Sequence, residues 1–282
     1  MLNALSFDVE DYYHAHYFNP VAPFEDWSGF PSRVVENTRL VLDFLAGRSI
    51  TATFFVLGWV AEQHPDLVCR IHAAGHEIAT HGYRHALIYT QTPDEFSADL
   101  GRSMALLQDI TGEPILGHRA SAFSITDDCL WALDAIEEAG LRYDSSVFPR
   151  IPHDAHGVTE MVRHTHRIRP NLWEIPVATV QLFGRIVPVA GGGYFRTFPY
   201  AFSRWGIRRV NAEGHPAVVY LHPWEFDPEQ PKVPGATFTA RFRNRHNVRG
   251  NERRLVRLCE DFSFAPIREV FAEVLGAGNE EE

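Results

Sequence analysis

Two histidines four residues apart and a group of carboxylates are the side chains in this chain best suited to chemistry. The segment HGYRH holds His81 and His85, which can both reach one metal ion if the backbone turns helically after a strand. Alone, such a pair is more often two ordinary loop or N-cap histidines. The segment FDVED adds the carboxylates of Asp8, Glu10 and Asp11. Two histidines with one carboxylate predict a hydrolytic divalent metal site, with zinc as the default ion.

These residues stand at the ends of short apolar runs, which are the elements that must position them. The runs cover residues 4–9, 52–57, 77–81, 115–119, 141–145, 173–177 and 217–222. Several are apolar on both faces, as buried parallel strands are. Helix signals lie between them, such as the capping box that Thr92 opens and Gly112 closes, and a further helix that Thr126 opens. About seven strand and helix repeats predict an α/β barrel of parallel strands.

The polar residues at these run ends are expected to meet. In a parallel barrel the carboxyl ends of all strands lie on one face, where active sites are built. Five of the seven runs carry candidate residues at or near their ends, namely Asp8, Glu10, Asp11, His81, His85, Arg119, Asp144 and His222. We therefore expect these side chains to form one polar site at that face of the barrel.

Composition narrows the function classes. The 282 residues carry a formal net charge of −10, which argues against a nucleic acid or an anionic membrane as partner. Three separated cysteines predict neither a disulfide framework nor a metal site. The first residues lack a basic stretch, and the longest apolar run, residues 52–61, is too short to span a membrane. We expect a soluble, cytoplasmic protein without stable membrane insertion.

Five ordered segments resemble the motifs of the polysaccharide deacetylases, a carbohydrate esterase family. They are SFDVEDYYH, HGYRH, GHRASAFS, YDSSVFP and YLHPWEF, and the resemblance runs from Ser6 to about Val270. The GGGYFR and HPWEFDP segments are similar to those of the branch found with exosortase exopolysaccharide loci. The resemblance implies a distorted (β/α)7 barrel over residues 1–230, a C-terminal extension over residues 231–282, and metal-dependent removal of N-acetyl groups from a glycan of an exopolysaccharide or its precursor.

The resemblance also implies roles at the metal. Asp8 resembles the general base, while a later carboxylate with His81 and His85 resembles the metal triad. The family usually has two adjacent aspartates, whereas here Val9 and Glu10 separate Asp8 from Asp11. Strand alternation would place Glu10 on the face of Asp8, and a bulge would deliver Asp11 instead. We favour Asp11 and keep Glu10 as the alternative, and either carboxylate could instead cap the N-terminus of a helix.

Further residues match the family around this centre. Arg119 resembles the arginine that orients the base, with a surface salt bridge as its alternative. His222 resembles the acid that protonates the leaving amine, although a lone histidine ending a strand is more often a satisfied core group. Asp144 could orient His222 or only form an Asx turn.

Four aromatic residues could stack on a sugar ring, although any one of them fits a core position equally well. They are Tyr12, Tyr13, Phe195 and Trp224. A backbone N–H of the Tyr12 and Tyr13 loop is expected to stabilise the oxyanion.

Three other functions remain open. A closed pocket would favour a small amide or cyclic imide over a glycan. Iron-dependent oxygenation would fit the metal ligands but has no use for an acid and base pair. A silent glycan-binding module is expected to lack Asp8 or His222, and this chain has both.

Overall fold

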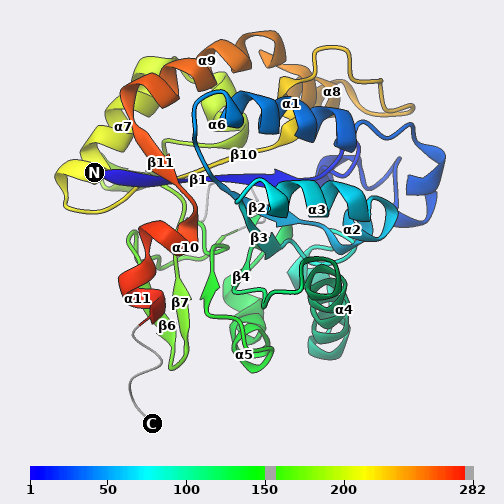
Figure 1. Ribbon diagram of the computed structural model, residues 1–282, viewed down its shortest axis with the longest axis horizontal. Helices are drawn as coiled ribbons and strands as arrows, with labels where there is room; N and C mark the ends of the chain where they lie inside the picture. Colours follow the sequence, from blue (N-terminus) through cyan, green and yellow to red (C-terminus); the bar gives the residue numbers. More distant parts are fainter. Residues whose placement is uncertain (150–156, 277–282) are drawn as a thin grey trace.

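The computed structural model describes residues 1–149 and 157–276, and its centre is a sheet of parallel strands (Figure 1). In sheet order these are β10 (Val218–Leu221), β1 (Leu2–Val9), β2 (Thr53–Val56), β3 (Glu77–Thr80), β4 (Gly117–His118), β5 (Tyr143–Asp144) and β7 (Leu172–Glu174). All seven apolar runs therefore form strands, and the prediction that these strands are parallel is confirmed. Strand β6 (His166–Arg169) adds antiparallel to β7, while β8 (Thr179–Leu182) and β9 (Arg185–Pro188) form a separate hairpin.

The parallel sheet curves into a distorted barrel. Strands β10 and β7 stand at the two ends of the parallel order. Just after β7, the Ala178 amide donates a 2.9 Å hydrogen bond to the Val218 carbonyl of β10. One backbone contact thus links the two ends where a full strand pairing would close a regular barrel.

Helices surround the sheet, and most of them cover its outer side (Figure 1). They are α1 (Val34–Ala46), α2 (Gly58–Gln63), α3 (Pro65–Ala73), α4 (Pro93–Thr111), α5 (Trp131–Glu138), α6 (Gly192–Thr197), α7 (Tyr200–Ala212), α8 (Phe238–Arg245), α9 (Val248–Asp261), α10 (Ile267–Val270) and α11 (Ala272–Gly276). The capping box at Thr92 opens α4 as expected, and Gly112 ends it with a φ of 70°. Thr126 opens only a short 3-10 turn, Asp127–Cys129, before α5. Within the described ranges, no helix is long and apolar enough to cross a membrane.

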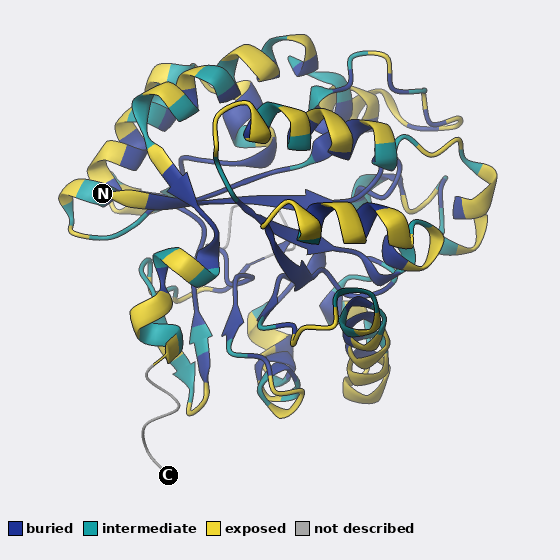
Figure 2. Ribbon diagram, in the orientation of Figure 1, coloured by how far each residue is buried: buried dark blue, intermediate teal, exposed yellow. Residues whose placement is uncertain are grey.

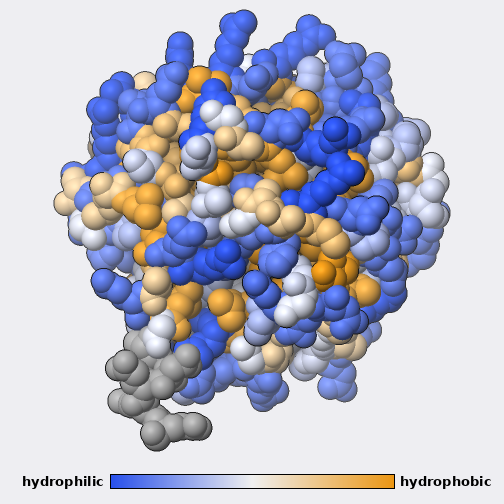
Figure 3. Space-filling view, viewed as in Figure 1, coloured by the Kyte–Doolittle hydropathy of each residue, from blue (hydrophilic) through white to orange (hydrophobic). Residues whose placement is uncertain are grey.

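The core lies between the strands and these helices. Leu5, Phe7 and Val9 of β1 pack with Phe54 and Val56 of β2, and all five side chains are inaccessible to solvent. Burying each contributes about 1.5–3 kcal/mol relative to leaving it exposed. Figure 2 shows the strands almost entirely buried, while the helices expose their outer faces. The space-filling view shows a largely hydrophilic face interrupted by hydrophobic patches (Figure 3).

The C-terminal part of the chain returns to the start of the barrel. Strand β11 (Ser263–Ala265) runs parallel to the first residues of β1. Helix α9 begins at Val248 after Asn247. Asn251 therefore lies inside α9, where its side chain donates to the Glu225 carbonyl at 3.3 Å. The domain boundary expected at residue 230 stays a prediction.

Candidate active site

Glu10, His81 and His85 form a buried cluster at the carboxyl ends of β1 and β3. One ligand atom from each lies within 4.8 Å of the other two, close enough to hold one metal ion. Glu10 Oε2 is 3.6 Å from His85 Nε2, and Glu10 Oε1 is 4.0 Å from His81 Nε2. The strand alternation that puts Glu10 on the same face as Asp8 thus brings it to the two histidines.

The atoms of this cluster suit a divalent ion. His81 Nδ1 lies 2.7 Å from the Arg119 carbonyl, which can only accept, so Nε2 keeps a free lone pair. Both nitrogens of His85 and Oε2 of Glu10 are buried without a hydrogen-bond partner among the described residues. Burial lowers the pKa of each histidine to about 4. Both imidazoles are therefore neutral at pH 7, as metal ligands must be.

Asp11 does not join this cluster, so our preference for it as the metal carboxylate was wrong. Its Oδ2 accepts hydrogen bonds from the Ser32 hydroxyl at 2.7 Å and from the backbone amides of Arg33 and Val34 at 2.8 and 3.2 Å. Its Oδ1 accepts from the Tyr12 amide at 2.9 Å. Asp11 therefore caps the N-terminus of α1, whose own N-cap residue provides no side-chain hydrogen bond. The bond to Asp11 also occupies the Tyr12 amide, one of the two backbone N–H groups of the loop that was expected at the oxyanion.

Asp8 and Arg119 form a buried ion pair beside the cluster. Arg119 Nη1 donates to Asp8 Oδ1 at 2.7 Å and to the Ser6 hydroxyl at 2.8 Å. The other guanidinium nitrogens donate to the carbonyl and hydroxyl of Ser145. Burial raises the pKa of Asp8, but the charge and hydrogen bond of Arg119, together with the charge of His222, outweigh burial and leave the pKa below its ordinary value. The carboxylate is therefore ionised and held in one orientation.

His222 lies between three carboxylates, those of Glu10, Asp8 and Glu225. Its Nε2 is 3.2 Å from Glu10 Oε1 and 3.9 Å from Asp8 Oδ2, and its Nδ1 is 3.4 Å from Glu225 Oε2. Burial lowers the pKa of His222, but the charges of Glu225 and Glu10 raise it to about 10. The ring is therefore protonated at neutral pH in the absence of a metal ion.

Asp144 does not orient His222, which corrects one of its two expected roles. Its carboxylate lies 2.7 Å from His118 Nδ1 and accepts from the Ser146 hydroxyl at 2.6 Å and the Ser146 amide at 3.2 Å. The contact two residues along the chain is the Asx-turn alternative. Asp144 thus supports the strand ends beside the site.

Glu225 takes the place beside His222 that Asp144 was expected to hold. Its Oε2 accepts from the His222 amide at 3.0 Å, and its Oε1 accepts from Arg196 Nε at 2.8 Å. Both Glu225 and Arg196 are buried. Their segments, HPWEF and GGGYFR, were visible in the sequence, but nothing local pairs residues 29 positions apart.

The glycines of the GGGYFR segment allow this contact. Gly191 has a φ of 117°, and a Cβ there would lie 2.2 Å from the Tyr220 ring. Only glycine fits this close approach, which starts α6 against β10. Arg196 is on that helix and therefore faces Glu225.

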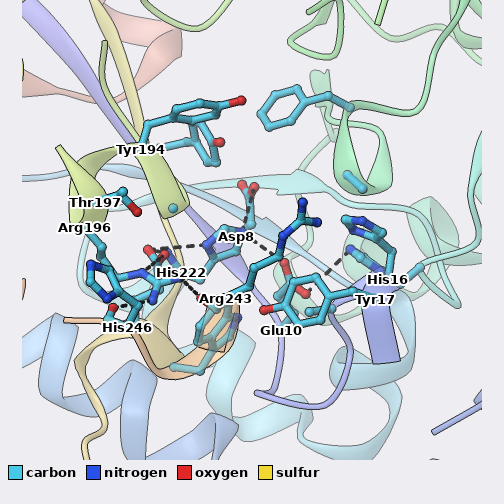
Figure 4. Close-up of a pocket in the computed structure, with 18 of the residues that line it drawn as sticks. Asp8, Glu10, His16, Tyr17, Tyr194, Arg196, Thr197, His222, Arg243 and His246 are labelled. Atoms are coloured by element: carbon cyan, nitrogen blue, oxygen red, sulfur yellow. Dashed lines mark hydrogen bonds and ion pairs between the residues drawn. The ribbon is translucent and has the colours of Figure 1, made fainter. Parts of the chain in front are cut away.

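A cavity of about 400 Å³ opens above these groups (Figure 4). Asp8, Glu10, His81, His85 and His222 are among its lining residues. Aromatic side chains on its walls include Tyr17, Phe148, Tyr194, Phe198 and Trp224. The ring of Trp224 stacks on that of His222 with centroids 5.2 Å apart. Of the four aromatic residues expected to bind sugar, Trp224 lines the cavity.

The other three aromatic residues lie elsewhere. Tyr12 and Tyr13 are fully buried in a cluster with Phe18 and Trp27, and Phe195 is fully buried in the main core. None of the three lines the cavity. The expectation that they bind substrate was wrong, because the C-terminal segments cover them. Tyr194, the neighbour of Phe195, faces the cavity instead.

Two family profiles match the sequence. The polysaccharide deacetylase profile covers residues 23–143, and a profile described as a domain of unknown function, DUF3473, covers residues 145–272. The two regions meet after β5, and both contribute to the cavity: His81 and His85 come from the first, and Arg196, His222 and Glu225 from the second.

Curated relatives match over short segments. The chain is 35% identical over 78 residues to a peptidoglycan-N-acetylglucosamine deacetylase of Bacillus cereus, covering 28% of each chain. It is 50% identical over 48 residues to a chitooligosaccharide deacetylase of Rhizobium leguminosarum bv. trifolii, covering 17% of this chain and 22% of the relative. Each match thus spans less than a third of the relative's length.

Solved structures are similar in fold to this chain over nearly its whole length. A Mycobacterium smegmatis protein assigned to the polysaccharide deacetylases superposes with a TM-score of 0.60 at 20% identity, covering 97% of this chain and 90% of that one. A peptidoglycan N-acetylglucosamine deacetylase gives 0.50 at 16% identity, covering 95% and 87%. The chain thus carries a polysaccharide deacetylase domain, followed by a DUF3473 region that is typical of the branch of that family associated with exosortases.

Proposed function

We propose that the protein hydrolyses the N-acetyl group of an N-acetylated sugar in a glycan, with a divalent metal ion held by Glu10, His81 and His85. The observation that carries this proposal is the arrangement of three potential ligands, an ionised aspartate and a protonated histidine around one cavity. Two imidazoles and a carboxylate make zinc the default ion. When bound, the ion polarises the acetyl carbonyl and lowers the pKa of a water molecule.

Asp8 is the proposed general base. Its Oδ1 is occupied by Arg119, while its Oδ2 lies toward His222 and the cavity. The free oxygen can accept the proton of the attacking water, because the pKa of Asp8 stays below its ordinary value and leaves the group ionised. Arg119 holds the carboxylate in place during that transfer.

His222 is the proposed general acid. The charges of Glu10 and Glu225 keep His222 protonated. A metal ion bound to Glu10 would neutralise the first of these charges, and the charge of Glu225 would still favour the protonated ring. Protonated Nε2 faces the cavity across from Asp8. It can donate its proton to the departing amine, which leaves a free amino sugar and acetate. No covalent intermediate is needed.

The shape of the cavity favours a glycan over a small amide or imide. Its walls carry several aromatic rings, of which Tyr194 and Phe198 lie with their centroids 6.3 Å apart near parallel. Phe198 and Phe242 line the same cavity and remain partly exposed. Partly exposed rings around an open mouth suit stacking on successive sugar rings. A silent binding module is less well supported, because Asp8, His222 and the metal cluster are all retained.

Branch membership supports an exopolysaccharide, or its precursor, as the source of that glycan. A cytoplasmic location stays part of the proposal. Cell fractionation followed by detection of the protein tests it, and recovery from another compartment would refute it.

Metal analysis combined with acetate release from N-acetylglucosamine oligomers tests the proposed reaction. We expect about one divalent ion per chain, and metal-dependent release of acetate by the unmodified protein. Glu10→Gln and His85→Ala should lose both. His72→Ala is the matched control, because His72 lies on α3 and pairs with Glu113 away from the cavity. Full activity after complete removal of metal would overturn the proposal.

A further inference from the structure

Arg243 is a cation at the mouth of the cavity that has no partner of its own. It lies in the last turn of α8, its side chain is exposed, and it lines the same cavity as Asp8, Glu10 and His222. Figure 4 shows its side chain extending into the cavity. Among the described residues, no carboxylate forms an ion pair with it, and its guanidinium makes no hydrogen bond.

The carboxylates that line the cavity do not require Arg243. Asp8 is paired with Arg119, and Glu225 is paired with Arg196. Glu10 faces His222 at 3.2 Å and belongs to the metal cluster. Each negative charge therefore has its own counter-charge, and Arg243 is a surplus positive charge.

The backbone around Arg243 is held firmly, although its side chain is free. Arg196 donates to the carbonyls of Arg243 at 3.2 Å, Asn244 at 3.1 Å and His246 at 2.8 Å. The side chain of Asn244 donates to the Tyr12 carbonyl at 3.2 Å. The end of α8 is thus anchored to the buried pair that supports His222, and the position of Arg243 over the cavity is set before any ligand arrives.

The local charge around Arg243 is also positive. Residues 237–257 contain seven arginines and a single acidic residue, Glu252, in a chain whose net charge is −10. Some of these arginines are used within the fold, since Arg245 donates to the Gln230 carbonyl and Arg254 to the Phe198 carbonyl. Arg243 is the one that faces the cavity.

We propose that Arg243 forms an anion subsite at the cavity mouth, which binds a carboxylate or phosphate group of the glycan substrate. The planar guanidinium donates two parallel hydrogen bonds to either group. The preferred substrate is then an acidic N-acetylated glycan, in which a negative charge lies beside the acetylated sugar. This inference rests on the proposed deacetylation.

Three tetrasaccharides separate the chemical classes. One is neutral N-acetylchitotetraose, one alternates N-acetylglucosamine with glucuronate, and one is N-acetylchitotetraose with a phosphate at its reducing end. We expect the metal-loaded protein to show at least about a tenfold higher kcat/KM for one of the acidic substrates, a factor that corresponds to about 1.4 kcal/mol. Whichever acidic substrate is preferred identifies the anion.

Variants test whether Arg243 is the cause. Arg243→Gln should lower the ratio of acidic to neutral kcat/KM about tenfold through KM, and Arg243→Lys should restore part of it. The same ratio should fall with added salt in the unmodified protein but not in Arg243→Gln. Arg253→Gln is the matched control, because Arg253 is an exposed arginine of α9 outside the cavity.

The outcomes distinguish this inference from the proposed function. Acetate release with no preference for either acidic substrate would overturn the subsite and leave the deacetylation intact. A fall in kcat that is equal for all substrates in Arg243→Gln would also overturn it. If no substrate releases acetate, the deacetylation fails, and calorimetric titration with both acidic tetrasaccharides still decides the subsite. Binding of either one that weakens in Arg243→Gln supports the subsite, and binding equal to that of the unmodified protein, or none, overturns it.

Discussion

Arg196 Nε donates a 2.8 Å hydrogen bond to Glu225 Oε1, and both side chains are buried. The second oxygen of Glu225 contacts the amide and the ring of His222. Burial raises the pKa of Glu225, but Arg196 and His222 lower it to about 2. The carboxylate is therefore charged at neutral pH. It links α6 to the proposed acid, although these residues are far apart in the chain.

Glu225→Gln should lower kcat by up to about 100-fold, because His222 loses the charge that favours its protonated form. Bound metal should stay at the level of the unmodified protein. The buried charge of Arg196 would lose its partner, at a cost of about 3–5 kcal/mol in the free energy of unfolding. Kinetics are therefore measured well below the unfolding temperature, with the exposed Glu229→Gln as control. An unchanged kcat in folded Glu225→Gln would exclude this role.

Replacing each of the two neighbouring carboxylates by its amide, in separate variants, distinguishes metal binding from helix capping. Glu10→Gln should reduce bound metal to a small fraction, because only two histidines would remain as ligands. Asp11→Asn should keep the metal but lower the free energy of unfolding by about 1–2 kcal/mol, because its amide replaces an oxygen that accepts from the start of α1. Metal analysis and urea unfolding measure the two effects. Loss of metal in Asp11→Asn alone would reverse the assignment.

Asp8→Asn should retain metal and lower kcat by about 10²–10⁴-fold, since it removes the proposed base without removing a ligand. Arg119 loses its buried counter-charge in this variant, so the unfolding temperature is measured in parallel. Single-turnover rates of acetate release give the effect on chemistry. If the variant instead releases the metal, Asp8 belongs to the ligand set.

Stability should fall as the pH is lowered from about 6.5 toward 4, in part because of His76. Burial lowers the pKa of His76 to about 4, and its neutral Nδ1 accepts from the Ala52 amide at 3.1 Å. The unfolded chain binds a proton near pH 6.5, so this stabilisation is complete above that pH and is lost as the pH falls toward the folded pKa. Urea unfolding at pH 7, 5.5 and 4.5 measures the decline.

His76→Asn provides the comparison for that measurement. Its Oδ1 can accept from the Ala52 amide but does not titrate, so the variant should lose less stability over the same pH range. His81 and His85 also have lowered pKa values and are present in both proteins, so their contribution cancels in the difference. Parallel curves for the two proteins would contradict the role of His76.

Local signals in the sequence were sufficient for most of the barrel. Strands such as β2 carry side chains that are apolar on both faces, as a buried parallel strand requires. The capping box at Thr92 forms within four residues and needs no distant partner. The spacing of His81 and His85 likewise brings two imidazoles together within one turn of chain. The family resemblance identified Asp8 and Arg119 as a pair, and the structure joins them at 2.7 Å.

Tertiary structure alone decided which neighbouring side chain enters the site. Glu10 and Asp11 are adjacent carboxylates at a strand end. Asp11 points away from the site because it accepts hydrogen bonds from backbone amides at the start of α1, which lie more than 20 residues further along the chain. Glu225 replaces Asp144 beside His222 because Arg196, on a distant helix, stabilises its buried charge. Tyr12 and Tyr13 are core residues because later segments cover them. Periodicity determines which elements form, whereas the direction of a polar side chain at a strand end depends on charges and hydrogen-bond donors that only folding brings near.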